Sequence, residues 1–314
     1  MGTFIARRLA QTLVVLFLLS LLVFMLINIL PGDPVVMMLG ADAYPEDIEA
    51  LRVQLGLDQP MLVQYGSWLF DVLQGDLGTS IMYDQNVADL IAIRLPITFY
   101  VGVMAIIVAA VVGIVAGIIC AVRRGSFLDQ GITVLANTGI SVPIFWLGIL
   151  GIYAFGLKLG WLPVQGFTSP FEDFWLSIKK MIMPVICLSV VPLAAIARQS
   201  RSAMLEVIHQ DYIRTALSKG LTERAIIIKH ALKNALIPIV TLIGLQTRHV
   251  VGGSVLIETV FNIPGMGRLL VSSIFDKDFV IVQAAVLVIG IAVCLVNLII
   301  DISYGYIDPR IRYR

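Results

Sequence analysis

Two long segments of this chain, residues 98–122 and 279–300, contain no charged side chain. A helix of that length, at about 1.5 Å per residue, crosses the roughly 30 Å hydrocarbon core of a bilayer. The composition agrees, because 59% of the 314 residues are hydrophobic and 14% are charged. A soluble core of this size needs far less apolar surface. The sequence therefore predicts an all-α membrane protein with several spans.

Four further segments are apolar and long enough to cross the bilayer, so six transmembrane helices are expected. The first is too long for a secretory signal and lacks a small-residue cleavage site, so we expect it to be retained. Cys120, Cys187 and Cys294 fall inside predicted spans, which indicates small buried side chains and neither a disulfide framework nor a metal site. The six expected spans are residues 9–30, 98–122, 131–157, 181–197, 235–260 and 279–300.

The basic residues predict the orientation of these spans. Lys and Arg cluster before the first span, after the second, between the fourth and fifth, and at the C-terminus. The segment between the first two spans instead carries a run of acids from Asp33 to Asp89. Positively charged loops are retained on the cytoplasmic side, so both termini are expected to be cytoplasmic. The net charge of +1 is thus the sum of a basic cytoplasmic side and an acidic outer side.

Residues 31–97 are too long for a simple connection and too rich in periodic apolar residues for a disordered one. We expect this outer segment to fold. Pro45 and the acids after it predict the start of one helix, and Gly56 predicts its end. A second helix is expected from a cap at Asp58 to a stop at Gly75.

The second of these helices is amphipathic and carries two large aromatic side chains, Tyr65 and Trp68. One interpretation is a helix on the outer membrane surface, with both rings as interfacial anchors. The other is a docking or gating element that contacts an external partner. Periodicity alone leaves both interpretations open.

The loop of residues 198–235 holds the densest basic cluster of the chain and also keeps helical periodicity. One helix is expected from about Ser202 to Gly220, which suits a left-handed helix stop, and Thr222 can cap a second one toward Pro238. Such a pair of helices can dock into a groove of a soluble partner. A basic surface attracted to anionic lipid is the alternative.

Pro143, Arg248 and Glu258 lie inside predicted spans and are candidates for lining a pathway. Pro143 frees backbone groups and predicts a kink, either beside a water-filled path or for packing alone. Arg248 lies about halfway along the fifth span, where a charge needs a cavity or a charged partner. We expect it to face a pathway or to form an ion pair with a neighbouring helix. Glu258, about 15 Å further along the same helix, is too distant to be that partner.

An intramembrane enzyme and an ion-coupled secondary transporter are the competing classes of function. The sequence contains no HExxH, GxSxG or P-loop pattern, and His209, His230 and His249 are too scattered for a zinc site. Secondary transporters typically carry midplane charges in two repeated halves, whereas this chain has its clear midplane charge in a single span.

The cytoplasmic segment DYIRTALSKG, residues 211–220, followed by HALKNALIP, residues 230–238, resembles the signature loop of permease subunits in peptide/nickel-type ATP-binding-cassette importers. That loop has the general pattern Glu-Ala-Ala, three residues, then Gly. Ala216 and Gly220 match it, while Arg214 and Thr215 replace the Glu and the first Ala. The resemblance implies a role in coupling to an ATPase for Asp211, Tyr212, Arg214, Thr215, Ala216 and Gly220.

Further motifs extend the resemblance over nearly the whole chain, toward permeases of the dipeptide and oligopeptide B type. Each motif alone is weak, but their order along the chain is specific. They are LPGDP (30–34), LGLDQP (55–60), QYGSWL (64–69), GDLGTS (75–80), RLPIT (94–98), SVPIFWLG (141–148), FNIPGMGRLL (261–270) and DPRIRY (308–313).

The resemblance implies the fold of a type I importer permease. Its parts would be a first helix in residues 1–30, an extracytoplasmic segment in residues 31–97 and a five-helix core in residues 98–314. The implied partners are a second homologous permease, two ATPase subunits that bind ATP and Mg, and an extracytoplasmic substrate-binding protein. The implied location is the inner membrane of a bacterium or archaeon, in contact with lipid.

The activity implied by the resemblance is ATP-driven import of peptides by alternating access. The permease itself would bind no cofactor, metal or nucleic acid and would not be an enzyme. Nickel chelates and glutathione remain open as cargo of the same architecture, and ion-coupled transport is the more distant alternative.

Overall fold

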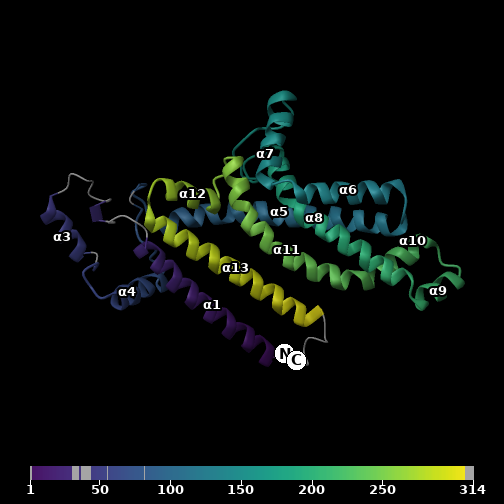
Figure 1. Cartoon of the computed structure of the whole chain (residues 1–314), viewed down its shortest axis with the longest axis horizontal. Coiled ribbons are helices and arrows are strands. Elements are labelled where there is room, and N and C mark those ends of the chain that lie inside the picture. The colour runs from purple at the N-terminus through teal and green to yellow at the C-terminus, as the bar shows by residue number, and fades with distance from the viewer. Residues whose placement is uncertain (1, 30–34, 37–43, 55, 81, 308–314) are drawn as a thin grey trace.

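The computed structural model describes residues 2–29, 35–36, 44–54, 56–80 and 82–307, and most of its helices run along one long axis (Figure 1). Five helices are long and apolar enough to cross a membrane. Each overlaps one predicted span, which confirms those five predictions. The five are α1 (Gly2–Ile29), α5 (Val87–Val122), α8 (Phe174–Ile208), α11 (Leu232–Val260) and α13 (Phe279–Ile307).

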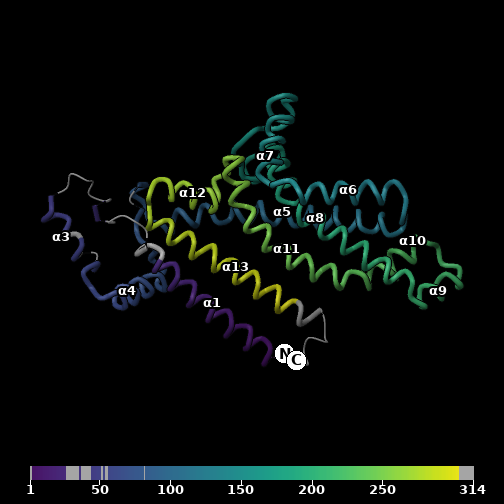
Figure 2. Tube along the Cα trace, in the orientation of Figure 1, coloured from purple at the N-terminus to yellow at the C-terminus, as the bar shows by residue number. Residues whose placement is uncertain are grey.

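The third predicted span, residues 131–157, is a broken helix, and it counts as a sixth span of the described residues if the bent pair is taken as one. α6 (Phe127–Ser141) and α7 (Ile144–Gly151), which continues as the π-helix η1 (Ile152–Lys158), meet at an angle of 103°. Pro143 lies at the break, because its ring disfavours the helical conformation of the preceding residue, which has φ −89° and ψ 128°. As a result, α7 projects sideways from the bundle (Figure 2).

The cytoplasmic loop also departs from the prediction. The pattern predicts one helix from about Ser202 to Gly220, but the structure divides this stretch between the end of α8 and α9 (Asp211–Ser218). After the turn at Gly220, α10 (Glu223–Ala225), the π-helix η2 (Ile226–Ala231) and α11 follow one another directly. The second cytoplasmic helix and the fifth span therefore form one continuous rod.

The core of the bundle is the crossing of α5 and α8. Gly113 and Gly117 of α5 permit a close approach, because α8 backbone lies where their side chains would be. A β-carbon on Gly117 would lie 2.6 Å from the Ala197 carbonyl oxygen and 2.9 Å from the Arg201 backbone nitrogen. α11 packs against both helices, and α1 packs mainly against α13. The α5–α8 contact therefore positions α11 directly, while α1 is held through α13.

The described residues of the outer segment include two short helices, α3 (Pro45–Gln54) and α4 (Met61–Leu73), at the end of the molecule opposite α9 (Figure 1). The predicted stops are confirmed, because Gly56 and Gly75 have φ angles of 67° and 88°. These angles lie in the left-handed region, which favours glycine and ends a helix.

The predicted cap of α4 is wrong. Pro60 occupies the N-cap position and makes no side-chain cap, because a turn that ends at Gln59 separates Asp58 from the helix. Two other sequence motifs, residues 30–34 and 308–313, lie outside the residues that the structure describes.

Gly117→Ala is expected to lower the thermal unfolding midpoint of the purified protein, because overpacking typically costs about 1–3 kcal/mol. Gly131→Ala is the matched control, since a β-carbon there meets no atom within 4 Å. Alanine is about 1 kcal/mol more favourable than glycine inside a helix, so this control should be neutral or stabilising. Circular dichroism melts in detergent measure both shifts. A Gly117→Ala protein as stable as the wild type would contradict the close crossing.

Candidate functional site

The predicted coupling residues gather on α9 and the turn after it, at one end of the molecule (Figure 1). α9 is amphipathic, because Ile213 and Ala216 are buried while its remaining residues are exposed. Ala216 therefore belongs to the buried face of the helix, which we call its seat, and not to its outer surface. The other predicted residues, all exposed, are Asp211, Tyr212, Arg214, Thr215 and Gly220.

The buried face of α9 belongs to a hydrophobic cluster that it shares with α5, α8, η2 and α11. Met204 comes from the end of α8, and Ile226 and Ala231 come from η2. A polar contact adds to this seat, because the Asn234 side-chain amide donates a 2.8 Å hydrogen bond to the Tyr212 hydroxyl. α9 is therefore held against η2 and the start of α11.

The turn after α9 has the predicted geometry. Gly220 has a φ angle of 76°, and a β-carbon there would meet nothing within 4 Å. The left-handed backbone alone therefore explains the need for glycine. The Thr222 hydroxyl oxygen accepts a 3.4 Å hydrogen bond from the Ala225 backbone N–H, which confirms its predicted role as a helix cap.

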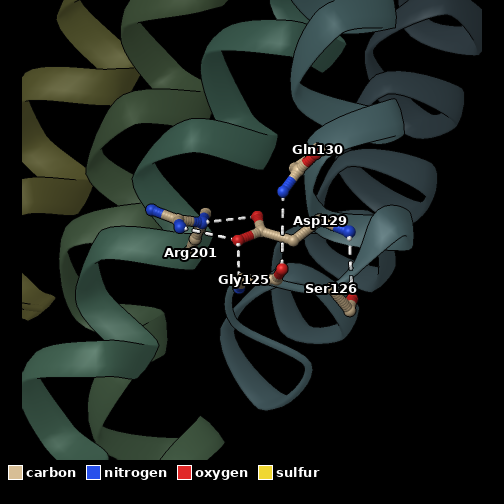
Figure 3. Close-up of polar contacts among 5 residues, drawn as sticks. All are labelled: Gly125, Ser126, Asp129, Gln130 and Arg201. Atoms are coloured by element: carbon tan, nitrogen blue, oxygen red, sulfur yellow. Dashed lines mark hydrogen bonds and ion pairs between the residues drawn. The ribbon is translucent and has the colours of Figure 1, made fainter.

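An ion pair that sequence reasoning missed joins Asp129 of α6 to Arg201 of α8 (Figure 3). Arg201 donates from Nε and Nη2 to the two carboxylate oxygens, each at 2.8 Å. The Gly125 backbone N–H donates to the same carboxylate at 3.0 Å. The Asp129 side chain is only 6% exposed. Two-point pairing and burial make this one of the strong kinds of polar contact.

This pair fixes the turn between α5 and α6 to α8, shortly before α8 leads into α9. Ser126 caps α6 by accepting a 3.3 Å hydrogen bond from the Asp129 backbone N–H. The spacing of Ser126 and Asp129 is a capping pattern that could have marked the start of α6. Nothing in the sequence selects Arg201 from the other basic residues of the loop.

Glu258 is fully buried and joins three helices near the end of α11. Its carboxylate accepts hydrogen bonds from the Thr98 hydroxyl at 2.7 Å and from the backbone N–H groups of Gly267 at 2.7 Å and Arg268 at 3.1 Å. The last two lie in the first turn of α12 (Met266–Phe275). In this structure Glu258 connects α11 to α5 and α12 through these hydrogen bonds. Its predicted place on a pathway stays a prediction.

Arg248 lies on an exposed part of α11 and is not paired with Glu258, as expected. Its Nε donates a 2.8 Å hydrogen bond to the side-chain oxygen of Asn297 on α13. Pro143 lies elsewhere, at the N-cap of α7. The structure thus does not bring the three pathway candidates together, and their role on a pathway stays untested.

A cavity of about 360 Å³ opens between α5, α11, α12 and α13. Thr98 and Gly267 lie in its wall and separate it from Glu258. The rest of the wall is almost entirely apolar, so the cavity is unsuited to a charged ligand. Typical lining residues are Phe99, Val103, Ile107, Val251, Ile289 and Val296.

Tyr65 and Trp68 attach α4 to α1. The Tyr65 hydroxyl lies 2.8 Å from the Ser20 hydroxyl, and the rings of Tyr65 and Trp68 lie 5.4 Å and 5.8 Å from the ring of Phe24. Both side chains are half-buried. Their predicted contact with a binding protein or gate stays a prediction, and the structure adds an anchoring role within the chain.

Asp129→Asn is expected to lower the thermal stability of the protein by about 2 kcal/mol, since a two-point charged hydrogen bond is lost. Asp301→Asn is the matched control, because its ion pair with Arg8 is partly exposed, at 21% and 41%. Exposed pairs contribute about 0–1 kcal/mol. Denaturant or thermal unfolding in detergent measures both losses. Equal losses in the two variants would contradict the special position of Asp129.

Two protein-family models match this chain. Residues 113–313 match the family described as "Binding-protein-dependent transport system inner membrane component". Residues 1–102 match the corresponding N-terminal family, described as "Binding-prot-dependent transport system membrane comp, N-term". Together the two matches cover most of the chain.

Curated relatives and a solved structure agree with these matches. A putative peptide transport system permease protein of Brucella abortus is 42% identical over all of this chain and all of its own length. The dipeptide transport system permease protein DppB of Alkalihalophilus pseudofirmus is 40% identical over 98% of each chain. An inward-facing structure of the MetNI methionine ABC transporter aligns with a TM-score of 0.57 at 19% identity, over 70% of this chain and 96% of that chain. The last likeness confirms the expected importer permease fold. This chain therefore belongs to the family of binding-protein-dependent transport system inner membrane components, which are multi-pass membrane permeases.

Proposed function

We propose that this chain is one of two permease subunits in an ATP-driven importer of peptides, and that α9 receives the movement of an ATPase subunit. The observation that carries the proposal is the seat of α9. Its outer face is exposed and mostly polar, while its inner face packs into a hydrophobic cluster that includes residues of α8 and η2. The peptide as cargo is supported by the names of the curated relatives, which are peptide and dipeptide permeases.

The proposed complex contains a second homologous permease, two ATPase subunits and an external substrate-binding protein. ATP and Mg bind to the ATPase subunits, and this chain supplies no ATP site of its own. Both termini and α9 face the cytoplasm, in keeping with the basic residues near them. The outer segment with α3 and α4 then faces the binding protein, because it lies at the opposite end of the molecule (Figure 1).

In the proposed mechanism, closure of the ATPase subunits moves α9, and the spans follow as levers. One lever is α8, which is locked to α5 at Gly117 and to α6 through Asp129 and Arg201. The other is the rod formed by η2 and α11. Nucleotide shifts the balance between inward-open and outward-open states only by the difference in its affinity for the two.

Purification and reconstitution test this function. The full chain, expressed together with the subunits encoded beside it, is expected to yield a stable complex that contains an ATPase. In proteoliposomes the complex should import peptide only with ATP and loaded binding protein. Peptide uptake by this chain alone under an ion gradient would contradict the proposal, and uptake restricted to nickel chelates or glutathione would contradict the cargo.

Gly220→Val is expected to uncouple ATP hydrolysis from transport, because a β-branched residue is strained at a φ angle of 76° and the turn after α9 would shift. Gly220→Asn is the matched control, since asparagine tolerates the left-handed conformation. Uptake per ATP hydrolysed should fall about tenfold in the valine variant and stay near wild type in the asparagine variant. Wild-type coupling in both would show that this turn does not transmit the movement.

Trp68→Ala is expected to loosen α4 from α1 and so to weaken the stimulation of ATP hydrolysis by loaded binding protein. Phe70→Ala is a control of similar size, because Phe70 is 62% exposed on the same helix. The measurement is binding-protein-stimulated ATPase activity per assembled complex. Normal stimulation together with poor assembly would instead support α4 as a membrane anchor.

A further inference from the structure

α11 carries an exposed stripe on which two ionisable side chains stand among leucine, glycine and threonine. Its members recur at helical spacing, at positions 245, 248, 249, 252, 256 and 259. Arg248 and His249 are both among them. Charged and ionisable side chains in a span normally face protein or a water-filled space. This stripe therefore borders the interior of the complete complex.

Arg248 brings a positive charge to this stripe without a matching acid. It lies about 18 Å along α11 from the outer end of the helix. Among the described residues its hydrogen-bond partner is Asn297, a neutral amide. Within the described parts of the chain, no ion pair includes Arg248. Asp301, one turn from Asn297 on α13, forms an ion pair with Arg8 at 3.0 Å.

The contact with Asn297 leaves the guanidinium suited to bind an anion. Asn297 occupies Nε at 2.8 Å and so fixes the plane of the group. The two terminal nitrogens remain for a second partner, and their parallel N–H groups match the geometry of a carboxylate. A carboxylate that enters a low-dielectric layer needs such a partner, because its transfer from water is otherwise very costly.

We propose that Arg248, positioned by Asn297, binds the C-terminal carboxylate of the peptide during translocation. This inference rests on the proposed function, because it takes the cargo to be a peptide. Every linear peptide with a free C-terminus carries this group, so the site serves cargo of many sequences. The binding is transient, since a transport site must also release its ligand.

Two other sources of an anion fit the observations less well. Lipid phosphates lie at the membrane surfaces, whereas Arg248 lies near the middle of a span. An acid from the second permease would neutralise Arg248 permanently, and the cargo carboxylate would then cross this level without a partner. Both alternatives become outcomes of the test.

The test uses the complete reconstituted importer and two probes, trialanine and trialanine amide. The amide lacks the carboxylate and is otherwise nearly the same size. The ratio of their initial uptake rates is compared between wild type and each variant. Any preference of the binding protein is common to all variants, so a change in the ratio belongs to the permease.

Arg248→Ala is expected to lower the ratio of acid to amide uptake by about tenfold, the loss of a charge-assisted pair. Asn297→Asp is expected to lower this ratio similarly, because the new carboxylate would form an ion pair with the Arg248 guanidinium and exclude the peptide. Arg248→Lys should lower the ratio less, since the charge remains while the two-point geometry is lost. His249→Ala, on the same stripe, is the control and should keep the wild-type ratio.

Unchanged ratios in Arg248→Ala and Asn297→Asp would overturn the carboxylate site and leave the proposed function intact. A complex that falls apart with Arg248→Ala but assembles with Asn297→Asp at the wild-type ratio would show a structural pair with the second permease. A ratio that changes only with the anionic lipid content of the vesicles would assign Arg248 to lipid. Wild-type complexes that import neither peptide would instead contradict the proposed function itself.

Discussion

The close crossing of α5 and α8 is the contact on which the rest of the bundle depends. In a membrane the apolar side chains gain little by leaving lipid, so helices associate through close packing of small residues. Gly113 and Gly117 supply this packing, because α8 occupies the space of their missing side chains. The crossing also brings Arg201 of α8 within reach of Asp129, whose ion pair closes the same end of the bundle.

Buried carboxylates fix the ends of helices, where backbone N–H groups have no hydrogen-bond partner within the helix. Asp129, Glu258 and Asp278 each accept hydrogen bonds from elements distant in sequence. Asp278 takes the Ser80 hydroxyl at 2.6 Å and the Met82 backbone N–H at 3.2 Å, which ties the outer segment to the start of α13. The ends are thus held by directional contacts, while the spans meet through apolar surfaces. Such a bundle tilts as rigid pieces more readily than it deforms.

Apolar length and glycine placement were sufficient to predict five spans and the turns at Gly56, Gly75 and Gly220, since these features are local. The bend in the third span depends on Pro143, whose effect on a helix could be foreseen only as a kink and not as an angle of 103°. The Asp129–Arg201 pair joins residues far apart in sequence, so no periodic pattern reveals it. The attachment of Tyr65 to Ser20 was hidden for the same reason.

The rod formed by η2 and α11 connects the two proposed sites, α9 and Arg248. η2 packs against α9, and the same rod carries Arg248 about halfway along α11. If α9 takes a different position in each state of the ATPase, the rod and the Arg248 side chain on it move as well. Coupling between two sites is reciprocal, so whatever binds at Arg248 in one state must also favour the matching position of α9. A charge on this rod would therefore allow arriving cargo to influence ATP hydrolysis at the far end of the molecule.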